Sequence, residues 1–207
     1  MNVVAFMAHP DDAEMCAGGT LARYAQSGAA VTVVVCSVPD NAEIRMEEAR
    51  RGGDILGVNV RFLAPPDRSP HWQVSDIVGY DLVRRFDAIV EELSPQVIFT
   101  HWIGDTHEDH VFVARASLST IRRRRIDLFA CEQPNQYAPS ASQMRLNTFV
   151  DISAVNERRL ESIRAHKSQL QRTDYARHLA MRSQYHGDRI GCAHAEAFEC
   201  LSQCLMI

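Results

Sequence analysis

The sequence contains no long apolar run. Although 46% of its 207 residues are hydrophobic, no stretch approaches the ~20 consecutive apolar residues that a membrane-spanning helix needs. No charged leader segment precedes the first apolar run, Val3 to Met7. We therefore expect a cytoplasmic protein with no membrane partner.

The sequence also lacks a strong excess of charge of either sign. Its 22 basic and 26 acidic residues leave a net charge of -4, which gives no basic footprint for nucleic acid or for an anionic membrane. The one basic run, Arg122 to Arg125, falls where a helix is expected to end, and cations suit that end because the helix dipole is negative there. We interpret this run as a solvated helix end and expect no nucleic-acid partner.

Closely spaced cysteine pairs are missing as well. Zinc-binding cysteines usually come as C-x2-C pairs, whereas the six cysteines here are dispersed. We interpret them as reduced packing residues. Cys200 and Cys204 are four apart and could share a helix face, but no further metal ligand lies near them. The six are Cys16, Cys36, Cys131, Cys192, Cys200 and Cys204.

No G-x-G-x-x-G motif follows the first apolar run, so dinucleotide binding is unsupported. The chain instead alternates strand and helix signals: the run Val31–Cys36 predicts a strand buried on both faces, and a helical pattern that stops at Pro95 leads into a strand at 97–100. We predict one α/β domain over residues 1–207, with a doubly wound, Rossmann-like, mostly parallel sheet flanked by helices. Later in the chain we expect a strand at 148–152 and a helix from a Ser153 cap to about Leu170.

Two polar motifs follow predicted strands. The segment His9-Pro10-Asp11-Asp12 comes after residues 3–7, and His107-Glu108-Asp109-His110 comes after residues 97–100. Side chains that leave the carboxyl ends of parallel strands converge above the sheet. The two motifs therefore predict one divided site, and His101 ends the same strand as the second motif.

The chemistry of these side chains leaves two interpretations of the first motif. A catalytic zinc usually takes three His, Asp or Glu ligands and a water, and His9, Asp12 and His110 fit that count. Asp11 then remains beside the water as a candidate general base. Alternatively, the motif caps a helix, with a carboxylate accepting backbone N–H bonds and Pro10 starting the first turn. The second motif favours the metal site.

The two motifs, together with Gly18-Gly19-Thr20-Leu21, resemble the LmbE-like, or PIG-L, family of zinc-dependent N-deacetylases, which includes enzymes acting on N-acetylglucosaminyl inositols and malates. The resemblance spans nearly the whole chain. Weaker matches occur in the expected order, at Ile44–Arg50, Ile55–Val58, His166–Gln169 and Ala195–Phe198.

The resemblance implies a role for each matching residue. His107 would stabilise the oxyanion or protonate the departing amine, and Asp109 would support it. Arg45 would contact substrate hydroxyls, and the implied cofactor is Zn2+, although other divalent transition metals accept the same donors. The implied metal ligands are His9, Asp12 and His110, and the implied general base is Asp11.

Two positions depart from the family pattern. Glu108 replaces a common proline, and its side chain is expected to point away from the metal. Asp105 stands where the branch that acts in mycothiol synthesis tends to have tyrosine, which argues against a substrate of that type.

The expected function is removal of the acetyl group from an N-acetylated amino sugar or its conjugate, which releases acetate and a free amine. Alternatives are an amidase for another acylated amine or thiol conjugate, and a nonenzymatic sugar-binding protein on the same scaffold; the presence of Asp11 argues against the latter. The sequence leaves open the oligomeric state, including a homo-oligomer, and whether Asp11 acts alone or with His107. It also leaves open the roles of Glu132, Asn135, Tyr137 and His166.

Overall fold

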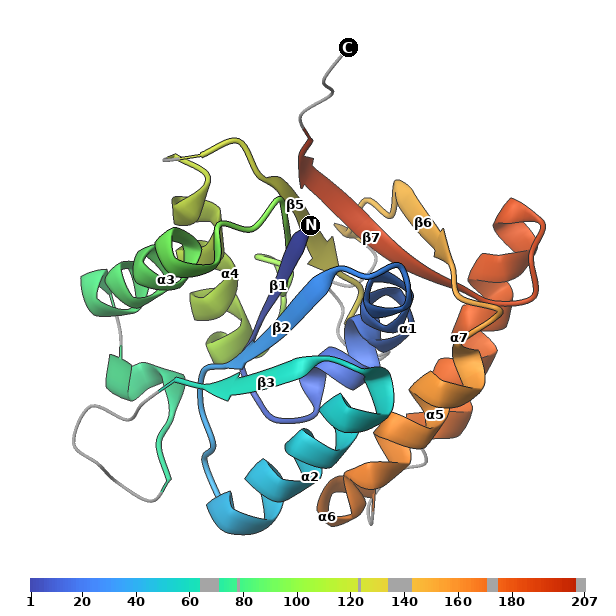
Figure 1. The fold of residues 1–207 in the computed structure, drawn as a ribbon, viewed down its shortest axis with the longest axis horizontal. Helices are drawn as coiled ribbons and strands as arrows, with labels where there is room; N and C mark the ends of the chain where they lie inside the picture. Colours follow the sequence, from blue (N-terminus) through green and yellow to red (C-terminus); the bar gives the residue numbers. More distant parts are fainter. Residues whose placement is uncertain (64–70, 78, 123, 134–142, 171–174, 204–207) are drawn as a thin grey trace.

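A seven-stranded sheet forms the centre of the described part of the chain (Figure 1). The computed structural model describes residues 1–63, 71–77, 79–122, 124–133, 143–170 and 175–203. The strand order is β3-β2-β1-β4-β5-β7-β6, and β7 runs antiparallel to both its neighbours while the other pairs are parallel. The strands are β1 (Asn2–Met7), β2 (Ala30–Val35), β3 (Asn59–Phe62), β4 (Val97–Thr100), β5 (Asp127–Cys131), β6 (Thr148–Asp151) and β7 (Ala195–Ser202). The predicted mostly parallel α/β fold is confirmed.

Helices lie on both faces of this sheet, as a doubly wound fold requires. Helices α1, α2 and α5 contact one another on one face, and α3 contacts α4 on the other (Figure 1). The helices are α1 (Asp12–Gln26), α2 (Ala42–Leu56), α3 (Tyr80–Leu93), α4 (Glu108–Thr120), α5 (Asn156–Ala165), α6 (Lys167–Leu170) and α7 (Tyr175–Ile190), with a 3-10 turn at Val74–Ile77. Among the described residues, none of the helices has the length and apolar character to cross a membrane.

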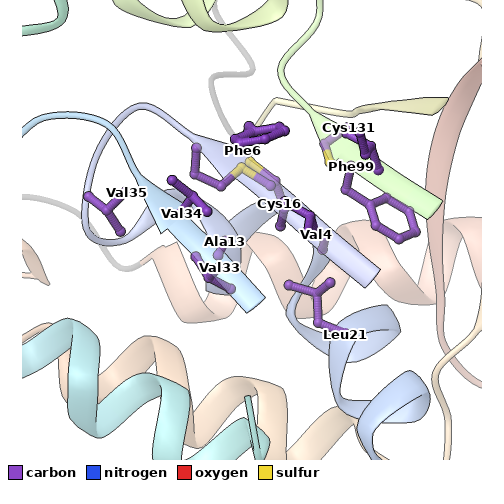
Figure 2. Close-up of a cluster of buried hydrophobic side chains, with 14 of the residues drawn as sticks. Val4, Phe6, Ala13, Cys16, Leu21, Val33, Val34, Val35, Phe99 and Cys131 are labelled. Atoms are coloured by element: carbon purple, nitrogen blue, oxygen red, sulfur yellow. The ribbon is translucent and has the colours of Figure 1, made fainter. Parts of the chain in front are cut away.

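Strand β1 passes through the core in the middle of the sheet. Residues Val3 to Met7 are fully buried, because β2 and β4 flank this strand and helices cover both its faces. Figure 2 shows Val4 and Phe6 of β1 among side chains of β2, β4 and α1. The Phe6 ring stacks on Phe86 of α3 at 3.9 Å between centroids. The strand that leads to His9 is therefore packed against neighbours at both edges and on both faces.

Helix α1 is fixed to the rest of the molecule by a buried ion pair. Arg159 Nε lies 2.9 Å from Glu196 Oε1. The same carboxylate accepts the backbone N–H groups of Gly19 and Thr20 at 2.9 and 2.7 Å, and Arg159 Nη2 donates to the carbonyl of Met15 at 3.2 Å. In a regular α-helix the N–H of Gly19 would bond that carbonyl itself. The pair therefore ties α5 and β7 to the backbone of the helix that begins at the site.

The structure corrects the predicted helix between Ser153 and Leu170. It begins at Asn156 and is interrupted at His166, so that α5 and α6 are separate. Ser153 is not its cap, because the Ser153 amide and hydroxyl both donate to Asp151 Oδ1, at 2.9 and 2.6 Å. This turn delays the helix, and the strand ends at Asp151.

Two further predictions can be compared with the structure. Cys200 lies in β7, so the idea that it shares a helix face with Cys204 is wrong for Cys200, and Cys204 is outside the described residues. The basic run does follow a helix end: α4 ends at Thr120, and Arg122 and Arg124 are partly exposed and pair with acidic side chains of α3. The interpretation of this run as a solvated helix end is confirmed for these two residues.

Candidate metal and catalytic site

The two polar motifs meet at the carboxyl ends of β1 and β4. These strands are parallel neighbours, and the sheet order changes direction between them, which is where ligand sites form in such folds. His9 lies between β1 and α1, His101 directly follows β4, and His110 lies in the first turn of α4. The predicted convergence of the motifs is confirmed.

Asp12 lies at the centre of this cluster and is only 6% exposed. Its Oδ2 atom is 3.4 Å from His9 Nδ1 and 3.2 Å from His101 Nε2, and its Oδ1 atom is 3.5 Å from His110 Nε2. The Oδ2 atom also accepts the backbone N–H of His9 at 2.7 Å. Asp11, the residue before α1, makes no side-chain capping hydrogen bond. The structure therefore does not support the alternative that Asp11 is a helix cap.

Two sets of three donor atoms lie close enough together to hold a metal ion. Within each set the atoms are within 4.8 Å of one another. The three predicted ligands are divided between the sets, and His110 belongs to both. Imidazole nitrogens with carboxylate oxygens suit zinc and neighbouring transition metals, so the donors fit the implied cofactor. The sets are His9, His107 and His110, and Asp12, His101 and His110.

The histidines of the cluster differ in their affinity for protons. Burial alone would lower the pKa of His9, but hydrogen bonds to Asp109 and Asp12 and the negative charges of Asp12 and Asp11 raise it to about 10. Burial lowers the pKa of His101 to about 4, assisted by the nearby imidazole of His110. Partial desolvation of its ring and the same neighbour also lower the pKa of His107. Because a metal binds only unprotonated imidazole, a metal ion and a proton compete for His9.

Asp11 is paired with Arg45. Arg45 is 6% exposed, and its Nη2 atom lies 3.3 Å from Asp11 Oδ1 while its Nη1 atom lies 2.9 Å from Asp40 Oδ1. Its Nε atom is buried without a hydrogen-bond partner among the described residues. The guanidinium therefore touches the predicted general base, in addition to the role in substrate binding that the resemblance implies.

Asp109 and His107 are placed differently from one another. Asp109 Oδ2 lies 3.1 Å from His9 Nε2, and within the described part of the chain its side-chain hydrogen bond goes to His9 rather than to His107. His107 is exposed, and its ring stacks on His110 at 4.5 Å and meets His9 edge-on at 4.8 Å. It can therefore reach a substrate bound over the cluster.

Sequence analysis missed the role of Asp105. Its Oδ2 atom lies 2.7 Å from His110 Nδ1. In the sequence this residue stands out only as a departure from the family pattern. The signal that could have found it is a carboxylate three residues before a helix whose first turn carries a candidate ligand.

The remaining candidates lie around the site. His166 Nε2 is 3.2 Å from Glu14 Oε1, and both are buried. Glu132 Oε2 is 2.7 Å from His186 Nε2. This pair lines a small pocket between α1, α5, α7 and β7, and none of the predicted catalytic residues or ligands lines it. Asn135 and Tyr137 are outside the described residues.

A sheet of this order, with a buried His/Asp cluster at its switch point, defines an α/β protein with a candidate metal site. Residues 4–121, more than half of the chain, match the PIG-L family, described as GlcNAc-PI de-N-acetylase. The chain belongs to this family.

Individual relatives agree with the family match. The chain is 27% identical to the 1D-myo-inositol 2-acetamido-2-deoxy-alpha-D-glucopyranoside deacetylase of Saccharomonospora viridis, over 79% of this chain and 83% of the relative. The fold is similar to that of the N,N'-diacetylchitobiose deacetylase of Pyrococcus horikoshii, with a TM-score of 0.77, 18% identity and coverage of 97% and 83% of the two chains.

The same fold also occurs with a different activity. GalB, the 4-carboxy-2-hydroxymuconate hydratase of Pseudomonas putida KT2440, is similar with a TM-score of 0.81, 20% identity and coverage of 100% of this chain and 98% of that one. At such identities the likeness concerns the fold, and the fold alone does not select the reaction.

Proposed function

We propose that this protein hydrolyses the acetamide group of an N-acetylated amino sugar or its conjugate, releasing acetate and a free amine. The observation that carries the proposal is the arrangement of Asp12 among three imidazoles with Asp11 beside it, in a chain of the PIG-L family. The activity named for the Saccharomonospora viridis relative supports the same substrate class.

We assign His9, Asp12 and His110 as the ligands of one divalent metal, with Zn2+ as the ion that best suits these donors. When bound, such an ion polarises the acetamide carbonyl and lowers the pKa of a bound water to roughly 7. The two imidazoles and the carboxylate come from the ends of two strands and the start of two helices. Their positions are therefore set by the sheet.

Asp11 is assigned as the general base that takes the proton of the attacking water. It precedes Asp12, so the base lies next to a ligand of the metal. Arg45 Nη2, 3.3 Å from Asp11 Oδ1, restricts the direction of this carboxylate. A general base contributes typically 10²–10⁴-fold to rate.

His107 is assigned as the second catalytic group. Asp109 is assigned as a residue that stabilises the cluster through its contact with His9. The exposed ring of His107 can donate a hydrogen bond to the developing oxyanion or a proton to the leaving nitrogen. Its pKa is lowered by partial desolvation of the ring and by His110. The ring of His107 is therefore mainly neutral at neutral pH. It can donate a proton to the leaving nitrogen once it has received one from Asp11.

Arg45 is assigned to the substrate's hydroxyl groups as well as to Asp11, because its planar fork can donate to several acceptors at once. The proposed substrate is a small N-acetylhexosaminyl compound, free of a lipid anchor. We propose a single domain over residues 1–207.

A substrate panel tests this proposal. The metal-loaded protein is incubated with N-acetylglucosamine, a soluble N-acetylglucosaminyl conjugate, an N-acetyl amino acid and a membrane-embedded N-acetylglucosaminyl lipid, and free primary amine is measured. We expect amine from the soluble sugars. Amine only from the amino acid would favour the general amidase, and binding of sugar without any amine would favour the nonenzymatic alternative.

A further inference from the structure

Asp105 joins two parts of the site through one buried carboxylate. Its side chain is 3% exposed, and its Oδ2 atom lies 2.7 Å from His110 Nδ1. Its Oδ1 atom accepts the backbone N–H of His107 at 3.1 Å. The carboxylate therefore contacts an assigned metal ligand and the residue that directly precedes α4.

The backbone that carries Asp105 is itself tightly packed. Its N–H donates to the carbonyl of Trp102 at 3.2 Å. The preceding residue, Gly104, lies so close to the Trp102 ring that an added Cβ would be 2.3 Å from it. The indole is buried. The turn that presents Asp105 to His110 is thus held against a large side chain.

This contact decides which nitrogen of His110 carries the proton. An ionised carboxylate accepts hydrogen bonds and cannot donate them, so Nδ1 of His110 must be the N–H donor to Asp105. In the neutral ring the lone pair then lies on Nε2, the atom that faces Asp12 Oδ1 at 3.5 Å. That is the tautomer a metal ion at Asp12 requires.

We propose that Asp105 is a positioning residue of the metal site: it holds His110 in the Nδ1–H tautomer with Nε2 directed at the metal, and it ties the start of α4 to the same point. The inference rests on the proposed ligand role of His110, but not on the identity of the substrate. Loss of such a contact to a liganding histidine typically costs 10–100-fold in metal affinity.

The Asp105→Asn variant separates this role from simple space filling. Asparagine has the size of aspartate, but it cannot accept from both His110 Nδ1 and the N–H of His107, because one of its two polar atoms is a donor. If the NH2 group of the asparagine faces His110 Nδ1, it stabilises the tautomer that is protonated at Nε2, which leaves no lone pair on Nε2 for a metal ion. We therefore expect Asp105→Asn to bind Zn2+ about 10–100-fold more weakly than the wild type and no better than Asp105→Ala.

The measurement is the Zn2+ dissociation constant of the purified full chain, by competition with a chromogenic chelator and without substrate. Asp76→Asn serves as the matched control, because Asp76 Oδ2 accepts the N–H of Gln73 at 2.8 Å outside the site; it should bind Zn2+ as the wild type does. Wild-type affinity in Asp105→Asn, with weaker binding only in Asp105→Ala, would show that Asp105 merely fills space.

A second measurement needs no variant. Nitrogen NMR of the histidine-labelled, Zn2+-loaded wild type should show His110 bound through Nε2 and protonated at Nδ1. Coordination through Nδ1, or no Zn2+ binding at all by the wild type, would overturn the inference. Weakened binding in Asp105→Asn without any deacetylation by the wild type would leave the inference standing and reject the proposed function instead.

Discussion

At the scale of single residues, the site brings buried histidines and carboxylates into contact, and several of their pKa values are shifted as a result. Asp12 is surrounded by three imidazoles. Charge interactions with His110 and His101, together with hydrogen bonds from His101 and His9, outweigh burial and lower the pKa of Asp12 well below the usual range. Without a metal, a proton on His9 supplies the balancing positive charge. A proton and a metal ion therefore compete for the same lone pair of His9.

Substitution of the two adjacent aspartates should separate metal binding from catalysis. Asp12→Asn removes a proposed ligand and should lose most of the metal, as should His9→Ala and His110→Ala. Asp11→Asn should keep the metal and lower kcat by ~10²-fold or more, the range for a lost general base. Elemental analysis and turnover numbers check this. Equal metal loss in Asp11→Asn and Asp12→Asn would mean that ligand and base have been exchanged.

Arg45→Lys should lower kcat/KM while leaving the metal content unchanged. Arg45 spans Asp40 and Asp11 with two nitrogens of one planar group, and a lysine ammonium cannot reproduce that geometry. A fall in kcat would indicate action through Asp11, and a rise in KM would indicate lost contacts to substrate hydroxyls. Asp40→Asn, at a carboxylate 62% exposed, should have a smaller effect. A kinetically silent Arg45→Lys would contradict both roles.

The raised pKa of His9 predicts opposite pH effects on the metal-free fold and on metal binding. The pKa rises from 6.5 in the unfolded chain to about 10 in the folded chain. Its contribution to stability is therefore complete below pH 6.5 and is lost as the pH rises toward 10. The Tm of the metal-free protein should fall over this window, and Zn2+ affinity should rise. In His9→Gln both slopes should flatten; an unchanged slope would rule out His9 as the cause.

At the scale of elements, α1 carries the site at its start and its main anchor further along. The Gly18-Gly19 pair is explained by packing: a Cβ at Gly19 would be 2.8 Å from Ile152, whereas one at Gly18 would be 3.3 Å from Arg159 Cγ. The Ala195–Phe198 segment, a weak match in the sequence, supplies Glu196 to the backbone of this helix. Elements that look unrelated in the sequence thus hold one helix in place.

Gly19→Ala should destabilise the fold by about 1–3 kcal/mol, the usual cost of overpacking a core. Gly18→Ala makes the same chemical change in the same helix with more clearance, so its cost should be smaller. Urea unfolding of both variants gives the comparison. Equal stability of the two would show that Ile152 moves aside without cost.

The elements also show where sequence patterns succeed and where they fail. Strands β1, β2 and β4 were predictable because a strand buried on both faces needs a continuous apolar run. The interruption between α5 and α6 was not predictable, because neither glycine nor proline stands at His166, where the helix breaks. The His166 side chain instead contacts Glu14, from a helix far away in the sequence. The cap at Ser153 failed for a local reason, since the amide and the hydroxyl of Ser153 both donate to Asp151 Oδ1 in a turn that precedes the helix.

At the scale of the whole molecule, the sheet order brings the two motifs together. About a hundred residues separate His9 from His110, and only the parallel pairing of β1 with β4 makes them neighbours. Strand–helix alternation predicts such a sheet, and the motifs predict where its site lies. The antiparallel placement of β7 between β5 and β6 was not predicted, because strand pairing over such separations leaves no local pattern.

The fold alone does not establish that the reaction is deacetylation, since the hydratase GalB has a similar fold. The most direct test of the proposed function is therefore a product balance on a soluble N-acetylglucosaminyl conjugate, with acetate and free amine measured together. We predict equal amounts of both from the metal-loaded wild type, and at least ~10²-fold less from Asp11→Asn at the same metal content. Loss of substrate without acetate or amine, or equal rates in the two proteins, would contradict the account.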